Sequence, residues 1–486
     1  MKRFRIGTGM LCCFAFGAFT GLLAAAERRI TSVNELQAVL ANIEPGDRLV
    51  VAAGVYTTNG PLAIVAAGRA DAPIVIAAES IGAVEIGGTH GFSVARSGAY
   101  VVIQGFVFLH SAGTTNVAAG AHHVRFLRNT FRCTGPGPYL QVSGDDVEIG
   151  YNEFRDKETV GNMLSVTGEG GQVARRLWVH HNYFHDFVNA RQNGAETIRF
   201  GLSGLSMSEG HGMVEHNLFV RCMGENELIS NKSCANTYRF NTFIDSPGTQ
   251  LTLRHGNDCQ VYGNYLRHTA GIRIFGDRHQ VFSNYLEANS IGINLGNGDG
   301  EVVDGSDLRC HDRPDNCVIA FNTFIDNRSH YELTRRARGM GATGITFANN
   351  ILQGGGRAAV IEGPNPGALW SGNLIWNLES PGDLPTEGYA EADPLLTRDE
   401  RGIYRLKAGS PAIDAAIGAY AAVAVDFEGQ PRTSAKDKGA DEFAPGPSPA
   451  RILTEQEVGP MADSPGTTPR RTPLQRQPGL GRRASE

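Results

Sequence analysis

The sequence predicts an all-β protein built as a parallel β-helix solenoid with a capping helix at its N-terminal end. Three observations predict this architecture. Glycine accounts for 61 of the 486 residues, well above the usual share of about 7%, which is typical of many turns between short strands. A motif of Asn, any residue and an aromatic or aliphatic residue recurs with a period near 23 residues and occasional insertions. The segments around this motif alternate apolar and polar residues over stretches too short for helices.

Residues 1–26 have the features of a secretory signal. A basic start precedes an apolar stretch, Met10 to Leu23, and three alanines provide a small-residue cleavage site before Glu27. The stretch is too short and too rich in glycine to predict a membrane span. We therefore expect a periplasmic or secreted protein with no membrane insertion after signal cleavage; anchorage by an uncleaved signal is the alternative.

The capping helix is predicted over residues Ser32 to Ile43. Apolar residues recur there at helical spacing, and Pro45-Gly46-Asp47 ends the helix before a strand that begins at Arg48. A helix at this place would cover the open end of the first coil.

The repeated motif sets the coils of the solenoid. A unit of about 23 residues holds three short strands and their turns, and each unit buries its apolar face against its neighbours. Leucine-rich repeats have a similar period, but this chain lacks their leucine-dominated positions. Stacked asparagines at a turn can form side-chain ladders, which explains the motif without a catalytic role. The motif asparagines are Asn129, Asn152, Asn182, Asn217, Asn241, Asn264, Asn284, Asn322, Asn350 and Asn373.

The end of the chain differs in composition from the repeats. From about Ala444 it is rich in proline and arginine, lacks lysine and has few large apolar residues. We predict a disordered tail over residues 444–486, which leaves residues 27–443 for the β-helix that carries the chemistry.

The charge balance limits the partners. The chain has 44 Lys and Arg against 50 Asp and Glu, a formal charge of −6, and a pI near 6.2. This argues against a generic nucleic-acid binder. We expect no nucleic-acid partner and a monomeric chain.

Six cysteines follow the predicted signal. Cys310 and Cys317 bracket a polar loop and are the best candidates for a disulfide, which an exported protein can form. The other four resemble small buried hydrophobic residues, and no Cys/His spacing resembles a zinc site.

Polar residues with a possible chemical role gather between Asn193 and His255. Glu225 and Glu227 are at i and i+2, hence on one face of a strand. Lys232 and Arg254 are 22 residues apart, so a period near 23 places them on adjacent coils about 5 Å apart. Each feature alone also fits an exposed strand with ordinary charges, and their register with the coil period favours a site.

The chemistry of the acidic side chains suits a hard cation. Two glutamates and Asn193 offer oxygen ligands, which favour Ca²⁺ over zinc or copper. Asn193 reaches the same face as Glu225 only if the interval between them includes a loop insertion.

Three runs resemble polysaccharide lyase family 6, which contains alginate lyases and chondroitinase B: Asn193 to Gly201, Glu225 to Ser233, and Leu251 to Asn257. The resemblance spans roughly residues 28–443. It implies a right-handed parallel β-helix and calcium-assisted β-elimination of uronate polysaccharides. By motif, it implies the calcium ligands Asn193, Glu225 and Glu227, the base Lys232, and Arg254 acting at the leaving oxygen. Glu196 is close enough to compete with Asn193.

The chemistry of these residues also supports a β-elimination, independently of the resemblance. Removing the C5 proton of a uronate requires neutralising the adjacent carboxylate, which Ca²⁺ does. Neighbouring cations favour the neutral form of Lys232, as a base requires. Arginine holds its proton tightly, so Arg254 serves as a fixed charge on the leaving oxygen or, as the resemblance suggests, as the donor. The acid is otherwise Lys232 itself, water or His255, and His255 can instead orient a neighbour.

The resulting hypothesis is an exported lyase that cuts an anionic polysaccharide, alginate first and dermatan sulfate second. Arg199 and Arg273 are candidate residues for binding its carboxylates, although either can equally be a surface ion-pair partner. A non-catalytic β-helical carbohydrate-binding protein is the alternative, but binding would not require a lysine in register with Arg254 beside a metal site. A hydrolase of the pectinase kind would need clustered Asp, which these motifs lack.

Overall fold

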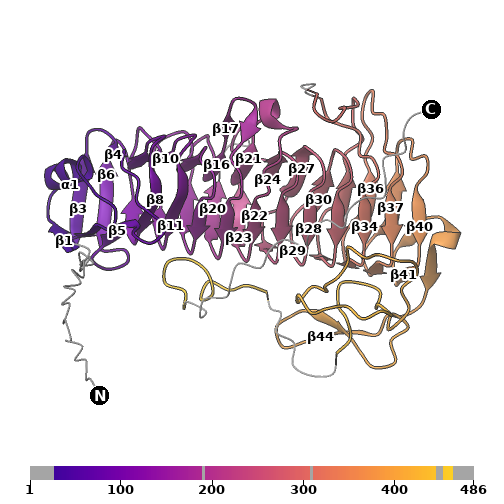
Figure 1. Ribbon diagram of the computed structural model, residues 1–486. Coiled ribbons are helices and arrows are strands. Elements are labelled where there is room, and N and C mark those ends of the chain that lie inside the picture. The colour runs from indigo at the N-terminus through magenta and orange to yellow at the C-terminus, as the bar shows by residue number, and fades with distance from the viewer. Residues whose placement is uncertain (1–26, 189–191, 307–309, 445–451, 464–486) are drawn as a thin grey trace, which may run out of the picture.

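The computed structural model describes residues 27–188, 192–306, 310–444 and 452–463. Three long parallel sheets run along a solenoid of stacked coils that extends from residue 27 to residue 391 (Figure 1). Each coil contributes one strand to each sheet in turn, which confirms the predicted parallel β-helix. The predicted signal, residues 1–26, lies outside the described residues.

The strands of sheet A, in spatial order, are β1 (Glu27–Ile30), β2 (Arg48–Val51), β5 (Ile74–Ala78), β8 (Ala99–Gln104), β11 (His122–Leu127), β14 (Glu148–Gly150), β19 (Trp178–His180), β22 (Met213–Glu215), β25 (Thr237–Arg239), β28 (Gln260–Tyr262), β31 (Gln280–Phe282), β34 (Val318–Ala320), β37 (Thr346–Ala348) and β40 (Leu369–Ser371). Those of sheet B are β3 (Gly54–Thr58), β6 (Val84–Gly88), β9 (Phe106–Phe108), β12 (Thr130–Phe131), β15 (Glu153–Lys157), β20 (Tyr183–Val188), β23 (Leu218–Met223), β26 (Thr242–Ile244), β29 (Tyr265–Arg267), β32 (Tyr285–Glu287), β35 (Thr323–Ile325), β38 (Ile351–Gln353), β41 (Asn373–Trp376) and β43 (Tyr389–Glu391). Those of sheet C are β4 (Leu62–Ile64), β7 (Phe92–Val94), β10 (Thr115–Val117), β13 (Leu140–Val142), β16 (Leu164–Val166), β21 (Ile198–Gly201), β24 (Glu227–Lys232), β27 (Gln250–His255), β30 (Ile272–Ile274), β33 (Ile293–Leu295), β36 (Ser329–Leu333), β39 (Arg357–Ile361) and β42 (Ser380–Gly382).

Outside these sheets lie the hairpins β17 (Gly168–Glu169) with β18 (Gln172–Val173) and β44 (Leu396–Arg398) with β45 (Tyr404–Leu406), and the helices α1 (Val33–Leu40), η1 (Ser203–Leu205) and η2 (Thr386–Gly388).

Helix α1 lies at the N-terminal end of the solenoid (Figure 1). Ser32 is its N-cap and accepts a hydrogen bond from the backbone N–H of Glu35. Leu36 and Leu40 are buried and belong to the apolar cluster that fills the coils. The helix is shorter than the predicted span of Ser32 to Ile43. No helix in the described part of the chain is long and apolar enough to cross a membrane.

The motif asparagines form the predicted ladder inside the solenoid. The side-chain carbonyl of Asn152, for example, accepts hydrogen bonds from the backbone and side-chain amides of Asn129, at 2.9 and 3.0 Å. The same pair of bonds repeats from Asn152 to Asn182 and along the series to Asn373. Because burying an amide without partners is costly, each rung fixes the register of the next coil.

The β-helix ends before the predicted boundary at residue 443. Its last parallel strand, β43, ends at Glu391, and the following residues fold into a lobe that contains the β44–β45 hairpin. This lobe packs outside the later coils, with Phe427 against Tyr285 and Val423 in a cluster with Phe321 (Figure 1). The single domain predicted over residues 27–443 therefore contains two structural parts, the β-helix and the C-terminal lobe.

Part of the predicted disordered tail packs on the solenoid, which corrects that prediction for residues 452–463. Leu453 and Val458 cluster with Tyr183, Leu218 and Val220 of β20 and β23. Composition alone missed this because two apolar side chains suffice to cover an apolar patch already present on sheet B.

Cys310 and Cys317, the candidates for a disulfide, are both free thiols in the structure. Cys317 lies in the core, where its thiol contacts the carbonyl of Gly276 at 3.4 Å. The side chain of Cys317 points into the interior of the coil, whereas Cys310 lies on the loop between β33 and β34. The other four cysteines are all buried, as expected: Cys133, Cys222, Cys234 and Cys259.

Candidate active site

Four neighbouring strands of sheet C, β21, β24, β27 and β30, bring the candidate residues together. Arg199 on β21 aligns with Ser230 on β24, then with Thr252 on β27 and Arg273 on β30. The two arginines therefore stand at either side of the strands that carry Lys232 and Arg254. The coil period places these residues on one face, as predicted from the sequence.

The register of Lys232 differs in detail from the expected one. A shift in the β24–β27 pairing aligns Asn231 with Leu253 but Lys232 with His255, so Arg254 is the extra residue of a bulge. Arg254 lies on the adjacent strand, as predicted, but is not paired with Lys232. Such a bulge re-aims side chains beside a site.

A buried asparagine, Asn231, holds the end of β24, where Lys232 lies. The side-chain amide of Asn231 donates to the carbonyls of Ser233, at 2.8 Å, and His255, at 3.0 Å. Its carbonyl accepts from the hydroxyl of Tyr238 at 2.8 Å. These bonds tie the end of β24 to the end of β27, which fixes the backbone on which Lys232 and His255 stand.

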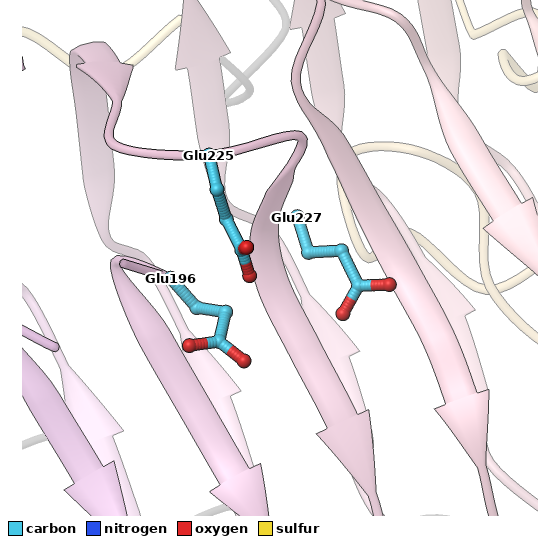
Figure 2. A group of neighbouring side chains, drawn as sticks. All are labelled: Glu196, Glu225 and Glu227. Atoms are coloured by element: carbon cyan, nitrogen blue, oxygen red, sulfur yellow. The ribbon is translucent and has the colours of Figure 1, made fainter. Parts of the chain in front are cut away.

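Three carboxylates converge next to Lys232: Glu196, Glu225 and Glu227 (Figure 2). Glu196 lies just before β21, Glu225 lies in the bend before β24, and Glu227 begins β24. All three are buried, and one carboxylate oxygen from each lies within 4.8 Å of the others. A group of this kind concentrates negative charge that must be offset by cations.

Cations from the protein surround this group. Lys232 Nζ lies 3.2 Å from Glu196 Oε1, and the second oxygen of Glu196 accepts from Asn162 at 2.8 Å. Arg254 Nε and Arg273 Nη1 lie 3.3 and 3.7 Å from Glu227 Oε1. In contrast, Glu225 has a carboxylate on either side.

The pKa values follow from these positions. Burial, and then the charges of Glu196 and Glu227, raise the pKa of Glu225 to about 7. Burial opposes the charge of Glu196 too, but Lys232 and Arg199 outweigh it and hold the pKa of Glu196 below its usual value. Burial and two neighbouring carboxylates therefore make Glu225 the member of the group that takes up a proton as the pH falls through about 7.

His255 is neutral in this setting. Burial, followed by the charges of Arg254 and Lys232, lowers its pKa to about 3. It can therefore accept or donate one hydrogen bond as an imidazole, but it does not carry a positive charge at neutral pH.

Two arginines of the candidate site each have a buried nitrogen atom without a hydrogen-bonding partner among the described residues. These are Nη1 of Arg254 and Nε of Arg199, both buried. Arg199 uses Nη2 to donate to the hydroxyl of Ser165 at 2.9 Å. Buried N–H groups of this kind suit anionic or hydroxyl oxygens of a bound ligand.

The candidate ligand set changes in one respect. Asn193 lies in an exposed turn, whereas Glu196, three residues later, is buried in the carboxylate group. The sequence offers Glu196 only as a competitor of Asn193, because the coil period does not indicate which residue of a loop turns inward. Asn162, on the preceding coil, was missed; its only sequence signal is a polar residue before the strand β16.

The donor set fits a calcium ion. Three carboxylates offer hard oxygen ligands at close range. Burial and the charges of Glu196 and Glu227 raise the pKa of Glu225, and a divalent cation bound there would offset those two charges. A second acidic group, Asp426, Glu428 and Asp441, lies in the C-terminal lobe, where Arg405 pairs with Glu428 and Asp441.

Comparison with known proteins identifies the family. A family model described as Chondroitinase B matches residues 30–336. The chain belongs to this family. The match covers every candidate residue from Asn193 to Arg273 and confirms the resemblance to polysaccharide lyase family 6. Comparison with curated proteins gives no significant match.

Solved structures of family 6 lyases share the fold. The alginate lyase AlyGC has 25% sequence identity and a TM-score of 0.70, over 79% of this chain and 56% of that one. A mannuronic acid specific family 6 lyase from human gut microbiota has 25% identity and a TM-score of 0.66, over 76% and 91%. A family 6 alginate lyase in complex with a trisaccharide has 20% identity and a TM-score of 0.61, over 80% and 92%. This chondroitinase B family member thus spans about half of AlyGC.

Proposed function

We propose that this protein is an exported polysaccharide lyase that cleaves a 4-linked uronate polysaccharide, alginate above all, by calcium-assisted β-elimination. The observation that carries the proposal is the position of Lys232 between a buried carboxylate group and the arginines of the adjacent coils. A carbohydrate-binding protein would need cations on its surface, but it would not need a lysine at a metal site.

Substrate binding would use the cationic face of sheet C. Arg199 and Arg273 stand at either side of the reacting residues and would contact sugar carboxylates. Glu196, Glu225 and Glu227 would hold Ca²⁺, and Asn193 remains a proposed further ligand from the adjoining turn. When bound, the ion would offset the charge of the uronate carboxylate and so acidify the C5 proton.

Lys232 would act as the base. In its neutral form, Nζ would take the C5 proton, a C4–C5 double bond would form, and the C4–O bond would break. Lys232 lies on a strand end fixed by Asn231, so its reach is defined by the backbone. An ion pair with Glu196 requires the ammonium form, so Nζ would have to leave Glu196 and release a proton to water before it could take the C5 proton.

Arg254 would stabilise the departing oxygen. Its unpartnered, buried Nη1 supplies an N–H donor for an oxygen that gains negative charge. The proton that this oxygen finally takes would come from protonated Lys232 or from water, since arginine is a poor acid. The neutral state of His255 favours an orienting role for it over proton donation.

The choice of alginate is supported by the solved relatives whose names include this activity. Dermatan sulfate is the alternative, because the matching family model carries the name Chondroitinase B. The decisive experiment incubates the purified protein with alginate, dermatan sulfate and pectate, and follows the ultraviolet absorbance of the unsaturated uronate product. No absorbance change with any uronate polymer, in the presence of Ca²⁺, would refute the lyase proposal.

Export rests on residues 1–26. Their basic start, apolar stretch and alanine-rich end support a cleaved signal. Mass measurement of the mature N-terminus from the secreted or periplasmic fraction is the test, and an intact Met1 in the cytoplasm would refute it.

A further inference from the structure

A second cationic cluster continues the site toward the C-terminal coils. Its centre is Phe275, which directly follows β30 and is buried. The guanidinium carbons of Arg273 and Arg336 lie 4.7 and 5.8 Å from the centre of its ring, and the ring of His311 lies 4.8 Å away. His311 comes from the loop after β33, which rises from the solenoid in Figure 1, and Arg336 from the loop after β36. The cluster thus adds loop residues to the strand residues of the site.

The guanidinium of Arg336 is held by two partners. Its Nη2 donates to Nδ1 of His311 at 2.7 Å and pairs with the carboxylate of Asp299. Asp299 also accepts a hydrogen bond from the backbone N–H of His311 at 2.9 Å, so the three residues brace one another. Burial and the charges of Arg254 and Arg336 lower the pKa of His311 to about 4, which leaves Nδ1 free to accept.

The cluster has more positive than negative charge. Arg254, Arg273 and Arg336 face Glu227 and Asp299, and Glu227 is one of the three clustered carboxylates that would bind calcium. In the described part of the chain, Nη1 and Nε of Arg336 have no hydrogen-bonding partner, and about a quarter of the side chain is exposed. An oriented guanidinium with free N–H donors beside other cations suits the oxygens of a carboxylate.

We propose that Arg336 binds a carboxylate of the polyuronate at a subsite beyond Arg273, with Asp299 and His311 positioning its guanidinium. This inference rests on the proposed lyase function and extends it to the loops after β33 and β36. The substrate would run along sheet C from the carboxylate group toward the C-terminal coils. Arg336 touches no reacting atom and contributes to affinity.

The test compares Arg336→Gln with Arg335→Gln. Both variants remove one positive charge from the same loop, but Arg335 is exposed and outside the cluster. For Arg336→Gln we expect KM for alginate to rise about tenfold, the usual size for a charge-assisted hydrogen bond, with kcat within about twofold of wild type. Arg335→Gln should leave KM within about twofold. Arg336→Lys should recover part of the loss, because it keeps the charge without the planar fork.

Two further measurements separate binding from structure. Calorimetric binding of an alginate hexasaccharide to Lys232→Ala should weaken about tenfold when Arg336→Gln is added, and thermal melting should not change. Asp299→Asn should also raise KM for alginate, because it removes the carboxylate that positions the guanidinium of Arg336. An unchanged KM and Kd in Arg336→Gln, or equal effects in Arg335→Gln, would overturn the subsite. A wild-type protein that binds the oligosaccharide but releases no unsaturated product would instead overturn the proposed lyase function.

Discussion

Glu196 Oε1 lies 3.2 Å from Lys232 Nζ, so one carboxylate belongs both to the candidate metal group and to the ion pair of the candidate base. A cation bound by the three glutamates would compete with Lys232 for this oxygen. Metal occupancy and the availability of Lys232 are therefore linked through Glu196. The same residue also accepts from Asn162, which keeps the carboxylate in place when either partner leaves.

Lys232→Ala should abolish elimination and leave the fold intact. The variant removes the base from a strand end without emptying the core, and the loss should reach or exceed about 10²-fold, as expected for a general base. Initial rates of unsaturated product and thermal melting measure the two effects. Lys407→Ala, which truncates an exposed lysine of the C-terminal lobe, is the control. A folded Lys232→Ala with wild-type activity would exclude Lys232 as the base.

Calcium affinity should depend on pH through Glu225. The carboxyl group has a pKa of about 7 without metal, so the ion must displace its proton below that pH. We expect the apparent Kd for Ca²⁺ to rise up to tenfold for each pH unit below 7 and to be nearly constant above 8. Calorimetric titration between pH 5 and 8 measures this.

Glu225→Gln is the matched variant for the calcium experiment. It should bind Ca²⁺ more weakly and flatten the pH dependence, because its amide does not titrate. Activity should fall with a chelator and return with added Ca²⁺. Full activity in excess chelator, with no bound metal by elemental analysis, would refute the calcium assignment.

Much of the fold follows from the sequence because a solenoid is nearly one-dimensional. Asn129 and Asn152 are 23 residues apart and make direct hydrogen bonds, so a sequence interval becomes a spatial contact. The same logic predicts that Lys232 and Arg254 are neighbours. It fails where the chain leaves the coil: Glu196 rather than Asn193 turns inward, and the bulge at Arg254 shifts the pairing. Those outcomes depend on loop packing, which no period encodes.

The C-terminal segment 452–463 should stabilise the solenoid without affecting catalysis. It contacts sheet B, whereas the candidate site lies on sheet C. Leu453→Ala removes a nearly buried side chain from the Tyr183 cluster and should cost about 2 kcal/mol of unfolding free energy, at the low end for buried leucines. Denaturant unfolding and kcat measure the two effects.

Met461→Ala is the control for the segment, since Met461 is 80% exposed. It should leave stability and kcat unchanged. Truncation after Phe443 should lower the melting temperature, and truncation after Asp463 should retain the contacts of Leu453 and Val458. An unchanged melting temperature after removal of residues 444–486 would show that residues 452–463 do not stabilise the solenoid.

Alginate should be cleaved faster than dermatan sulfate. Each sulfate adds a negative charge that the cleft must offset, and the cations of the site are already engaged: Lys232 pairs with Glu196, and Arg254 and Arg273 pair with Glu227. Few unpaired cations therefore remain for sulfate groups, since Arg336 also has a carboxylate partner, Asp299. The measurement compares initial rates on the two polymers at equal uronate concentration and at several salt concentrations, with Lys232→Ala as the blank. A higher rate on dermatan sulfate would reverse the preference and leave the elimination mechanism standing.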